Sequence, residues 1–384
     1  MQMLEKYKGR EQAFIKHKLL EAYLQALFMI VGQWNPRICY IDCFSGPWQE
    51  KSDDLMDTSI GISLDIMSKC RESLKAMGRD VQFRALYIEK DAGAHGKLCE
   101  FLSSNPRDGV TCTPLNGSFY DLRNNILQWC GSDDFAFFFI DPKGWKDVVE
   151  PTTLSPLLKR ENSEFLINFM YDFLVRVHRQ EQFKGQVKEI FGETPCTDGM
   201  SPSQIESHLL GLYRKNLKKT MAGPTKKPRF AYVSVQDRFK ARTKYELVYL
   251  TRHPLGIVKF IQASEKLDLI QKQVRQLTRI GDTGQGELFN VSEHSIGDES
   301  VALEEVKSYW LGKLSSSPEY FGSESLADMH EETGWLEKDF QEALRELLTE
   351  GKVENLDIKK TRRTKFVKFE ENSGLGERLR EIIE

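Results

Sequence analysis

The amino-acid sequence predicts an α/β protein with a doubly wound, mostly parallel, Rossmann-like sheet and a C-terminal winged helix-turn-helix domain. Three observations support this fold class. Apolar runs that end in a carboxylate, at Asp42, Glu89 and Asp141, alternate with helical patterns, as in an open parallel sheet. A glycine-rich break at 280–299 then interrupts the chain. Beyond the break, a helix–turn–helix pattern precedes the basic segment 358–365.

The N-terminal segment, residues 1–36, is expected to be helical and to pack on the core. Its apolar residues between Phe14 and Phe28 recur at helical spacing, and Asn35 and Pro36 end the pattern. The first residues are charged and lack the apolar stretch of a signal peptide. No apolar run approaches the roughly 20 residues that span a bilayer. We therefore expect a cytoplasmic protein with no membrane partner.

Residues 37–280 are expected to form the sheet domain. Its parallel strands are predicted at 38–42, 84–89, 110–115, 136–141 and 164–169. Its helices are predicted at 60–75, 93–102 and 120–130. Two later apolar runs, 229–235 and 245–252, are typical of an antiparallel pair that closes one edge, and a helix is expected at 255–276.

The remaining chain is divided into a linker, 281–300, a winged helix-turn-helix domain, 301–371, and a tail, 372–384. The helices of this domain are predicted at 301–313, 325–333 and 336–350, with Ser323 capping the second. Strands at 353–356 and 365–369 are expected to flank the basic wing. The wing residues that we expect to contact nucleic acid are Lys359, Lys360, Arg362, Arg363 and Lys365.

The seven cysteines include no C-x-x-C pair, and an odd count argues against a disulfide framework. No cluster of histidines and cysteines has the spacing of a zinc site, so no metal is predicted.

The three strand-end acids predict a nucleoside cofactor, because a doubly wound sheet binds its ligand at the carboxyl edge. Glu89 can accept hydrogen bonds from both ribose hydroxyls, and the edge of the third strand is expected to meet the adenine. Gly46 allows the backbone to approach a ligand closely. We expect S-adenosyl-L-methionine as the cofactor. The residues predicted to bind it are Asp42, Phe44, Ser45, Gly46, Glu89, Lys90, Ser118 and Phe119.

The fourth strand is predicted to carry the catalytic residues, Asp141 and Pro142. A carboxylate and a carbonyl fixed by the proline would hold an amino group so that its lone pair faces the methyl donor. Lys143 and Trp145 are predicted to contact the substrate, although packing is favoured over base stacking for Trp145. An Asp-Pro turn without catalytic function is the alternative for Asp141.

Six segments of the first two thirds of the chain resemble the three-Cys-motif partner proteins, a bacterial family with a class I methyltransferase-like core. They are YIDCFSGP, YIEKD, FIDPKG, FLINFMYDFLVR, KHKLLEAYLQAL and YELVYLTRHPLG. The resemblance implies methyl transfer and association with a radical-type enzyme that has three cysteines. The sequence departs from the methyltransferase pattern at Trp48, where a glycine is usual, and at Lys143-Gly144, where Pro-aromatic is usual.

Three classes of function agree with these patterns. The first is a methyltransferase of nucleic acid, DNA or RNA, which the basic wing favours. The second is a degenerate methyltransferase that serves as a scaffold or binding module for a partner enzyme, which Trp48 favours. The third is a methyltransferase of a protein or small molecule. A second basic strip, 214–219 with 226–229, is either another phosphate contact or a solvated helix surface.

Overall fold

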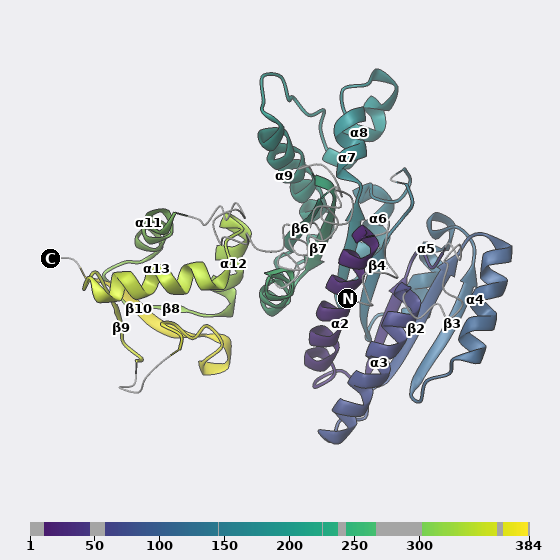
Figure 1. Ribbon diagram of the computed structural model, residues 1–384, viewed down its shortest axis with the longest axis horizontal. Coiled ribbons are helices and arrows are strands. Elements are labelled where there is room, and N and C mark those ends of the chain that lie inside the picture. The colour runs from purple at the N-terminus through teal and green to yellow at the C-terminus, as the bar shows by residue number, and fades with distance from the viewer. Residues whose placement is uncertain are drawn as a thin grey trace, which may run out of the picture. The chain divides into compact units, whose positions relative to one another are not determined.

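The computed structural model describes residues 11–46, 58–144, 146–224, 226–236, 243–265, 302–358 and 364–382. The chain divides into two compact units, Met1–His253 and Pro254–Glu384 (Figure 1). The segment 281–300, which the sequence predicts to be a linker, lies outside the described residues.

The first unit is built on a seven-stranded sheet in the order β3-β2-β1-β4-β5-β7-β6. Strands β1 to β5 are parallel to their neighbours, and β7 is antiparallel to both β5 and β6. This is the doubly wound order with one antiparallel strand inserted, so the predicted mostly parallel sheet and its antiparallel pair are confirmed. The strands are β1 (Arg37–Asp42), β2 (Gln82–Glu89), β3 (Val110–Asn116), β4 (Phe135–Ile140), β5 (Ser163–Phe169), β6 (Arg229–Gln236) and β7 (Thr243–Thr251).

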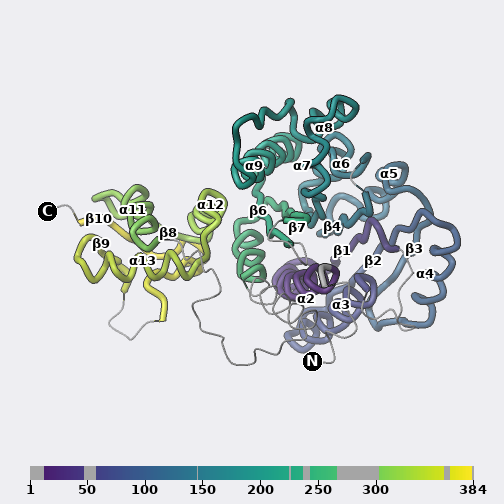
Figure 2. The backbone as a smooth tube through the Cα atoms, turned by 45° about the horizontal axis from the view of Figure 1, so that its top comes forward, coloured from purple at the N-terminus to yellow at the C-terminus, as the bar shows by residue number. Residues whose placement is uncertain are grey.

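Helices cover both faces of this sheet. On one face α2 and α3 lie side by side, whereas α5, α6 and α9 lie beyond the other (Figure 2). The helices are α2 (Glu11–Val31), α3 (Ser59–Ala76), α4 (Ala92–Ser104), α5 (Phe119–Cys130), α6 (Pro151–Leu158), α7 (Tyr171–Val177), α8 (Lys184–Phe191) and α9 (Pro202–Met221), with a 3₁₀ turn, η1 (Glu181–Phe183).

The central strand β4 shows why the sheet needs two helical layers. All six of its residues, FAFFFI, are buried, as expected of a parallel strand that is covered on both faces. Alternate residues serve opposite layers: Phe138 stacks on Phe165 with ring centroids 4.9 Å apart, and Phe137 packs near Tyr23 of α2. Because side chains alternate between the two faces of the sheet, this one apolar run contributes to the hydrophobic core on each face.

The carboxylate of Glu164 on β5 is fully enclosed beneath α2. It accepts hydrogen bonds from the hydroxyls of Tyr23 (2.8 Å), Tyr249 (2.7 Å) and Thr251 (2.8 Å). Burial raises the pKa of Glu164, and the three hydroxyl donors oppose that rise. The network fixes α2 to both β5 and β7.

The second unit contains the winged helix-turn-helix domain. A helix at 254–265 precedes it. The domain's three-stranded antiparallel sheet has the order β8-β10-β9. Its elements are α11 (Leu303–Lys313), β8 (Glu319–Phe321), α12 (Ser323–Thr333), α13 (Glu337–Thr349), β9 (Val353–Asn355), η2 (Asn372–Gly374) and β10 (Glu377–Glu381).

Two details of this domain differ from the sequence-based expectation. Ser323 does not cap α12: Gly322 is the N-cap, and the Ser323 hydroxyl donates to the carbonyl of Phe369 at 3.3 Å. Residues 365–369 are not a strand either, and the strand that pairs with β9 is β10, within the expected tail. The buried carboxylate of Glu377 accepts from Asn355 Nδ2 (2.9 Å) and the Lys368 amide (3.0 Å), which joins β9, β10 and the intervening chain.

Replacing Glu164 by alanine is expected to lower the free energy of unfolding by about 3 kcal/mol or more. The substitution removes the shared acceptor of three buried hydroxyls, of which Tyr23 keeps another acceptor, the Tyr249 hydroxyl, and each hydroxyl left unpaired costs about 1–3 kcal/mol. Urea denaturation followed by circular dichroism measures this change. The control is Glu193→Ala at an exposed position, which is expected to change stability by less than about 0.5 kcal/mol. Equal stabilities of the two variants would contradict the assigned role of Glu164.

Candidate active site

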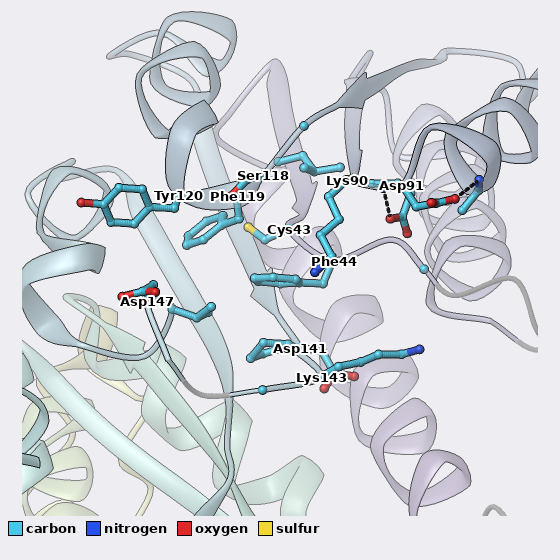
Figure 3. Close-up of a pocket in the computed structure, with 18 of the residues that line it drawn as sticks. Cys43, Phe44, Lys90, Asp91, Ser118, Phe119, Tyr120, Asp141, Lys143 and Asp147 are labelled. Carbon is cyan, nitrogen blue, oxygen red and sulfur yellow. Dashed lines mark hydrogen bonds between the residues drawn. The ribbon is translucent and has the colours of Figure 1, made fainter. Parts of the chain in front are cut away.

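The predicted cofactor-binding and catalytic residues lie at the carboxyl ends of β1, β2, β3 and β4. Strands β1 and β4 are neighbours, and the chain proceeds outward from them in opposite directions, which makes their carboxyl ends the switch point of the sheet. A cavity of about 1070 Å³, here called the first cavity, opens there (Figure 3). The predicted residues that line it are Phe44, Gly46, Glu89, Lys90, Ser118, Phe119, Asp141, Pro142 and Lys143.

Asp42 lies behind this cavity and does not line it. Its side chain is fully buried and accepts hydrogen bonds from the Phe44 amide (3.1 Å) and from the hydroxyl of Ser59 (2.7 Å), the first residue of α3. Burial raises the pKa of Asp42 to about 6, against the opposing effect of these two donors. Asp42 therefore holds the loop after β1 to the start of α3.

Ser45 fastens the same loop to β2. Its amide donates to the carbonyl of Ile88 at 2.8 Å, and its hydroxyl accepts from the Ile88 amide at 3.1 Å. Ser45 is buried and does not line the first cavity. The loop is consequently held against the end of β2, where Glu89 is located.

Gly46 and Glu89 are in close contact at the cavity wall. A Cβ atom on Gly46 would lie 1.6 Å from Oε2 of Glu89, so only glycine leaves the carboxylate in its present position. The other oxygen, Oε1, accepts from the Asp91 amide at 2.8 Å. The carboxylate of Glu89 is therefore fixed in orientation, as a diol acceptor must be.

Aromatic rings form another part of the first cavity's wall. The rings of Phe44 and Phe119 lie with centroids 5.3 Å apart. Ser118 stands at the N-cap of α5 but makes no side-chain cap hydrogen bond there. This edge of the site combines flat apolar surface with a short polar side chain, which suits a purine ring.

A second cavity, of about 400 Å³, adjoins the first and shares five lining residues with it. The shared residues are Phe44, Gly46, Asp141, Pro142 and Lys143. Other walls of this second cavity come from α2, β5 and β7, through Lys16, Asn168 and Tyr245. Asp141 thus stands between two neighbouring cavities.

The carboxylate of Asp141 is held on both oxygens. Lys16 Nζ forms a salt bridge to Oδ2 at 2.6 Å, and Asn168 Nδ2 donates to Oδ1 at 2.6 Å. The sequence reasoning missed both partners, although they lie within the segments KHKLLEAYLQAL and FLINFMYDFLVR that carry the family resemblance. The available signal was a lysine seven residues before Tyr23, and therefore on the same buried side of the helix.

Several predicted residues lie outside the described part of the chain: Trp48, Trp145 and the wing residues Lys359, Lys360, Arg362 and Arg363. The remaining wing residue, Lys365, pairs with Glu337 at 2.7 Å. Residues 323–349, which span α12 and α13, carry eight acidic side chains and two basic ones. Helices α12 and α13 are therefore acidic, whereas α11 carries two acidic and two basic side chains.

Residues 278–359 match the family model of the GMT-like wHTH domain. The chain is also similar to a solved structure named "Loganic acid methyltransferase with SAH", with 11% identity and a TM-score of 0.28. The similarity covers 70% of this chain and 88% of that one. No curated protein matches. The fold is the predicted doubly wound, mostly parallel sheet with a winged helix-turn-helix domain, and membership of the three-Cys-motif partner family stays a prediction.

The described residues hold neither a membrane-spanning helix nor a cluster of metal ligands. None of the helices described is long and apolar enough to cross a membrane. Within the same residues, no group of three or more potential ligand side chains is arranged to hold a metal ion.

Replacing Asp42 by asparagine is expected to remove one source of pH-dependent stability. The folded-state pKa, about 6, exceeds the ordinary value of 3.8, so the native state binds more protons between these values. The contribution of Asp42 therefore falls as pH rises from about 4 to about 6, by a total of about 3 kcal/mol. Asparagine has the same shape and does not titrate.

Urea denaturation at several pH values measures the effect. The difference in unfolding free energy between wild type and Asp42→Asn is expected to shift in favour of the variant as pH rises through this window. Parallel pH curves for the two proteins would show that Asp42 is not a buried titrating carboxyl.

Proposed function

We propose that this protein is an S-adenosyl-L-methionine-dependent methyltransferase that modifies an exocyclic amine of nucleic acid. The observation that carries the proposal is the position of Asp141 between two cavities at the switch point of a doubly wound sheet. One cavity has the features of a nucleoside site, and the other leaves room for a methyl acceptor.

The first cavity fits the cofactor on three counts. The carboxylate of Glu89 has a fixed orientation that suits the ribose hydroxyls. Gly46 keeps the neighbouring wall free of a side chain. Phe44, Ser118 and Phe119 offer an edge that suits the adenine. The cofactor supplies an electrophilic methyl group when it is bound, and the protein supplies position and electrostatics.

Asp141 is the residue that we assign to the acceptor. Its carboxylate accepts a hydrogen bond from the amine and orients the nitrogen. Lys16 and Asn168 keep the carboxylate in one position, so little reorganisation is required when the acceptor arrives. Pro142 restricts the backbone beside the Asp141 carbonyl.

The winged helix-turn-helix match and the basic wing support a nucleic-acid substrate. Because α12 and α13 are acidic, we expect the wing rather than α13 to contact the phosphates. The same acidity favours a second candidate, in which this domain docks a protein and the methyl acceptor is a protein or a small molecule. The radical-type partner with three cysteines is a further proposed partner, and it rests only on the family resemblance.

Calorimetric titration with S-adenosylmethionine tests the cofactor assignment. Glu89→Ala is expected to weaken binding by about 1–3 kcal/mol, because the ribose hydroxyls lose a charged acceptor. Gly46→Ala is expected to cost a similar amount, because its Cβ displaces the Glu89 carboxylate. The double variant should then be little weaker than either single variant, since both remove one interaction.

The matched control is Glu72→Ala at an exposed position of α3, which should leave cofactor affinity unchanged. Absence of detectable heat with the wild-type protein would overturn the methyltransferase proposal and favour the scaffold class.

Filter binding at several salt concentrations tests the wing. The measured quantity is the steepness with which the logarithm of the nucleic-acid affinity falls against the logarithm of the salt concentration, here called the salt slope. Replacing Lys360, Arg362 and Arg363 by alanine is expected to lower the salt slope by about 2–3, because each lost phosphate contact removes roughly 0.7–0.9. Lys338→Ala with Arg345→Ala, on α13, is the control and should leave the slope unchanged. Equal slopes for the wild type and the wing variant would assign the domain to protein docking instead.

A further inference from the structure

We propose that the second cavity recognises an amidine edge, in which an exocyclic amine stands beside a ring nitrogen that accepts a hydrogen bond. This proposal rests on the proposed function and specifies its substrate class. It selects adenine, cytosine and the N2/N3 edge of guanine, and it rejects uracil, thymine and hypoxanthine. The argument starts from the Lys16–Asp141 pair.

Lys16 and Asp141 place a donor and an acceptor side by side in the wall of the second cavity. The ammonium and the carboxylate are 2.6 Å apart, and their side chains keep 16% and 21% of their surface exposed. Lys16 Nζ also lies 5.4 Å from the centre of the Tyr245 ring. An ammonium has three N–H donors and a carboxylate about four acceptor sites, so their mutual contact leaves both with capacity for a ligand.

Asn168 adds an acceptor that the protein itself does not satisfy. Its Nδ2 donates to Asp141, which assigns the opposite atom as the oxygen. That oxygen, Oδ1, is buried and has no hydrogen-bond partner, although Asn168 belongs to the lining of the second cavity. A buried acceptor without a donor is unfavourable, and an N–H group of a ligand would satisfy it.

The donor and the two acceptors together match one edge of an aminated heterocycle. The two N–H groups of the amine meet Asp141 and Asn168, and the ring nitrogen accepts from Lys16. Adenine presents this pattern at N6 and N1, and cytosine presents it at N4 and N3. Deamination replaces the amine by a carbonyl and the ring acceptor by an N–H, which reverses the pattern and leaves the buried groups of the site unpaired.

The cavity also has suitable size and walls. Its volume of about 400 Å³ accommodates a base with its sugar, and Phe44, Phe173 and Tyr245 provide aromatic lining. Enzymes that modify a base take it out of the stack into such a pocket. The amine would then be recognised in the second cavity, next to the first, and Asp141 lines both cavities.

Equilibrium binding of matched nucleosides to the full-length protein tests this proposal. The pairs are adenosine with inosine, and cytidine with uridine, measured on protein saturated with S-adenosylhomocysteine so that the first cavity is filled. In at least one pair, the amino nucleoside is expected to bind about tenfold or more tightly than its deaminated partner. Lys16→Met and Asp141→Asn, which retain much of the side-chain shape, are each expected to bring that ratio close to one.

Lys18→Met is the matched control on the same helix, because Lys18 pairs with Glu21 and lines neither cavity. It should retain the wild-type ratio. Equal affinities within both pairs, or no binding of any nucleoside at millimolar concentration, would overturn the proposal. If S-adenosylhomocysteine itself binds normally in that case, the methyltransferase proposal stands. If it does not bind, the first cavity stays empty and can take adenosine in place of the cofactor. The pair of cytidine and uridine then tests the second cavity, because the cofactor contains no pyrimidine.

Discussion

The buried carboxylate of Glu164 is the constraint on which the geometry of the site depends. The hydrogen bond that it accepts from Tyr23 fixes the position of α2 along the helix axis and its rotation about that axis, relative to β5 and β7. Lys16 lies seven residues, and so about two turns, before Tyr23 and faces the same side. Anchoring Tyr23 in the core therefore delivers the Lys16 ammonium to Asp141. A helix that merely covered the sheet by apolar contact would not specify this position so closely.

The same principle operates at the end of β1. Asp42 and Ser45 do not line the first cavity, yet their hydrogen bonds connect β1 to α3 and to β2. This holds Gly46 against Glu89. Burying polar groups is unfavourable unless they are paired, and the raised pKa values of Asp42 and Glu164 reflect that cost. The loop after β1 and helix α2, which carry site residues, are thereby held in defined positions.

The sequence predicted those parts of the fold that depend on local apolar patterns. The five parallel strands and helices α3, α4 and α5 follow from apolar runs and helical periodicity, and the predicted bounds differ by only a few residues at each end, whereas α6, between β4 and β5, was not predicted. It did not predict β10, because Glu-Arg-Leu-Arg-Glu is a polar stretch with a single apolar residue, the buried Leu379. That strand is specified by tertiary pairing with β8 and β9 rather than by its own composition.

The site residues likewise divide into those that local sequence patterns predict and those that only the tertiary structure brings into place. The strand-end position placed Glu89 and Asp141 correctly at cavity walls, because strand ends converge by topology. It could not distinguish Asp42, which faces inward, since all three acids follow similar apolar runs. Helical spacing placed Lys16 on the buried side of its helix, but neither Lys16 nor Asn168 could be assigned to Asp141 from sequence, because they lie 125 and 27 residues from it. Only the registration of α2 and β5 brings them together.

The charge distribution of the winged helix-turn-helix domain bears on how a target would be selected. Reading a base sequence in duplex DNA requires an element in the groove, and the acidic α13 is poorly suited to lie between two rows of phosphates. A basic wing alone supplies affinity for the backbone and carries little sequence information. On the proposed function, discrimination must then be made by the pocket that receives the acceptor. The donor and acceptor groups of Lys16, Asp141 and Asn168 are placed where such discrimination would be made.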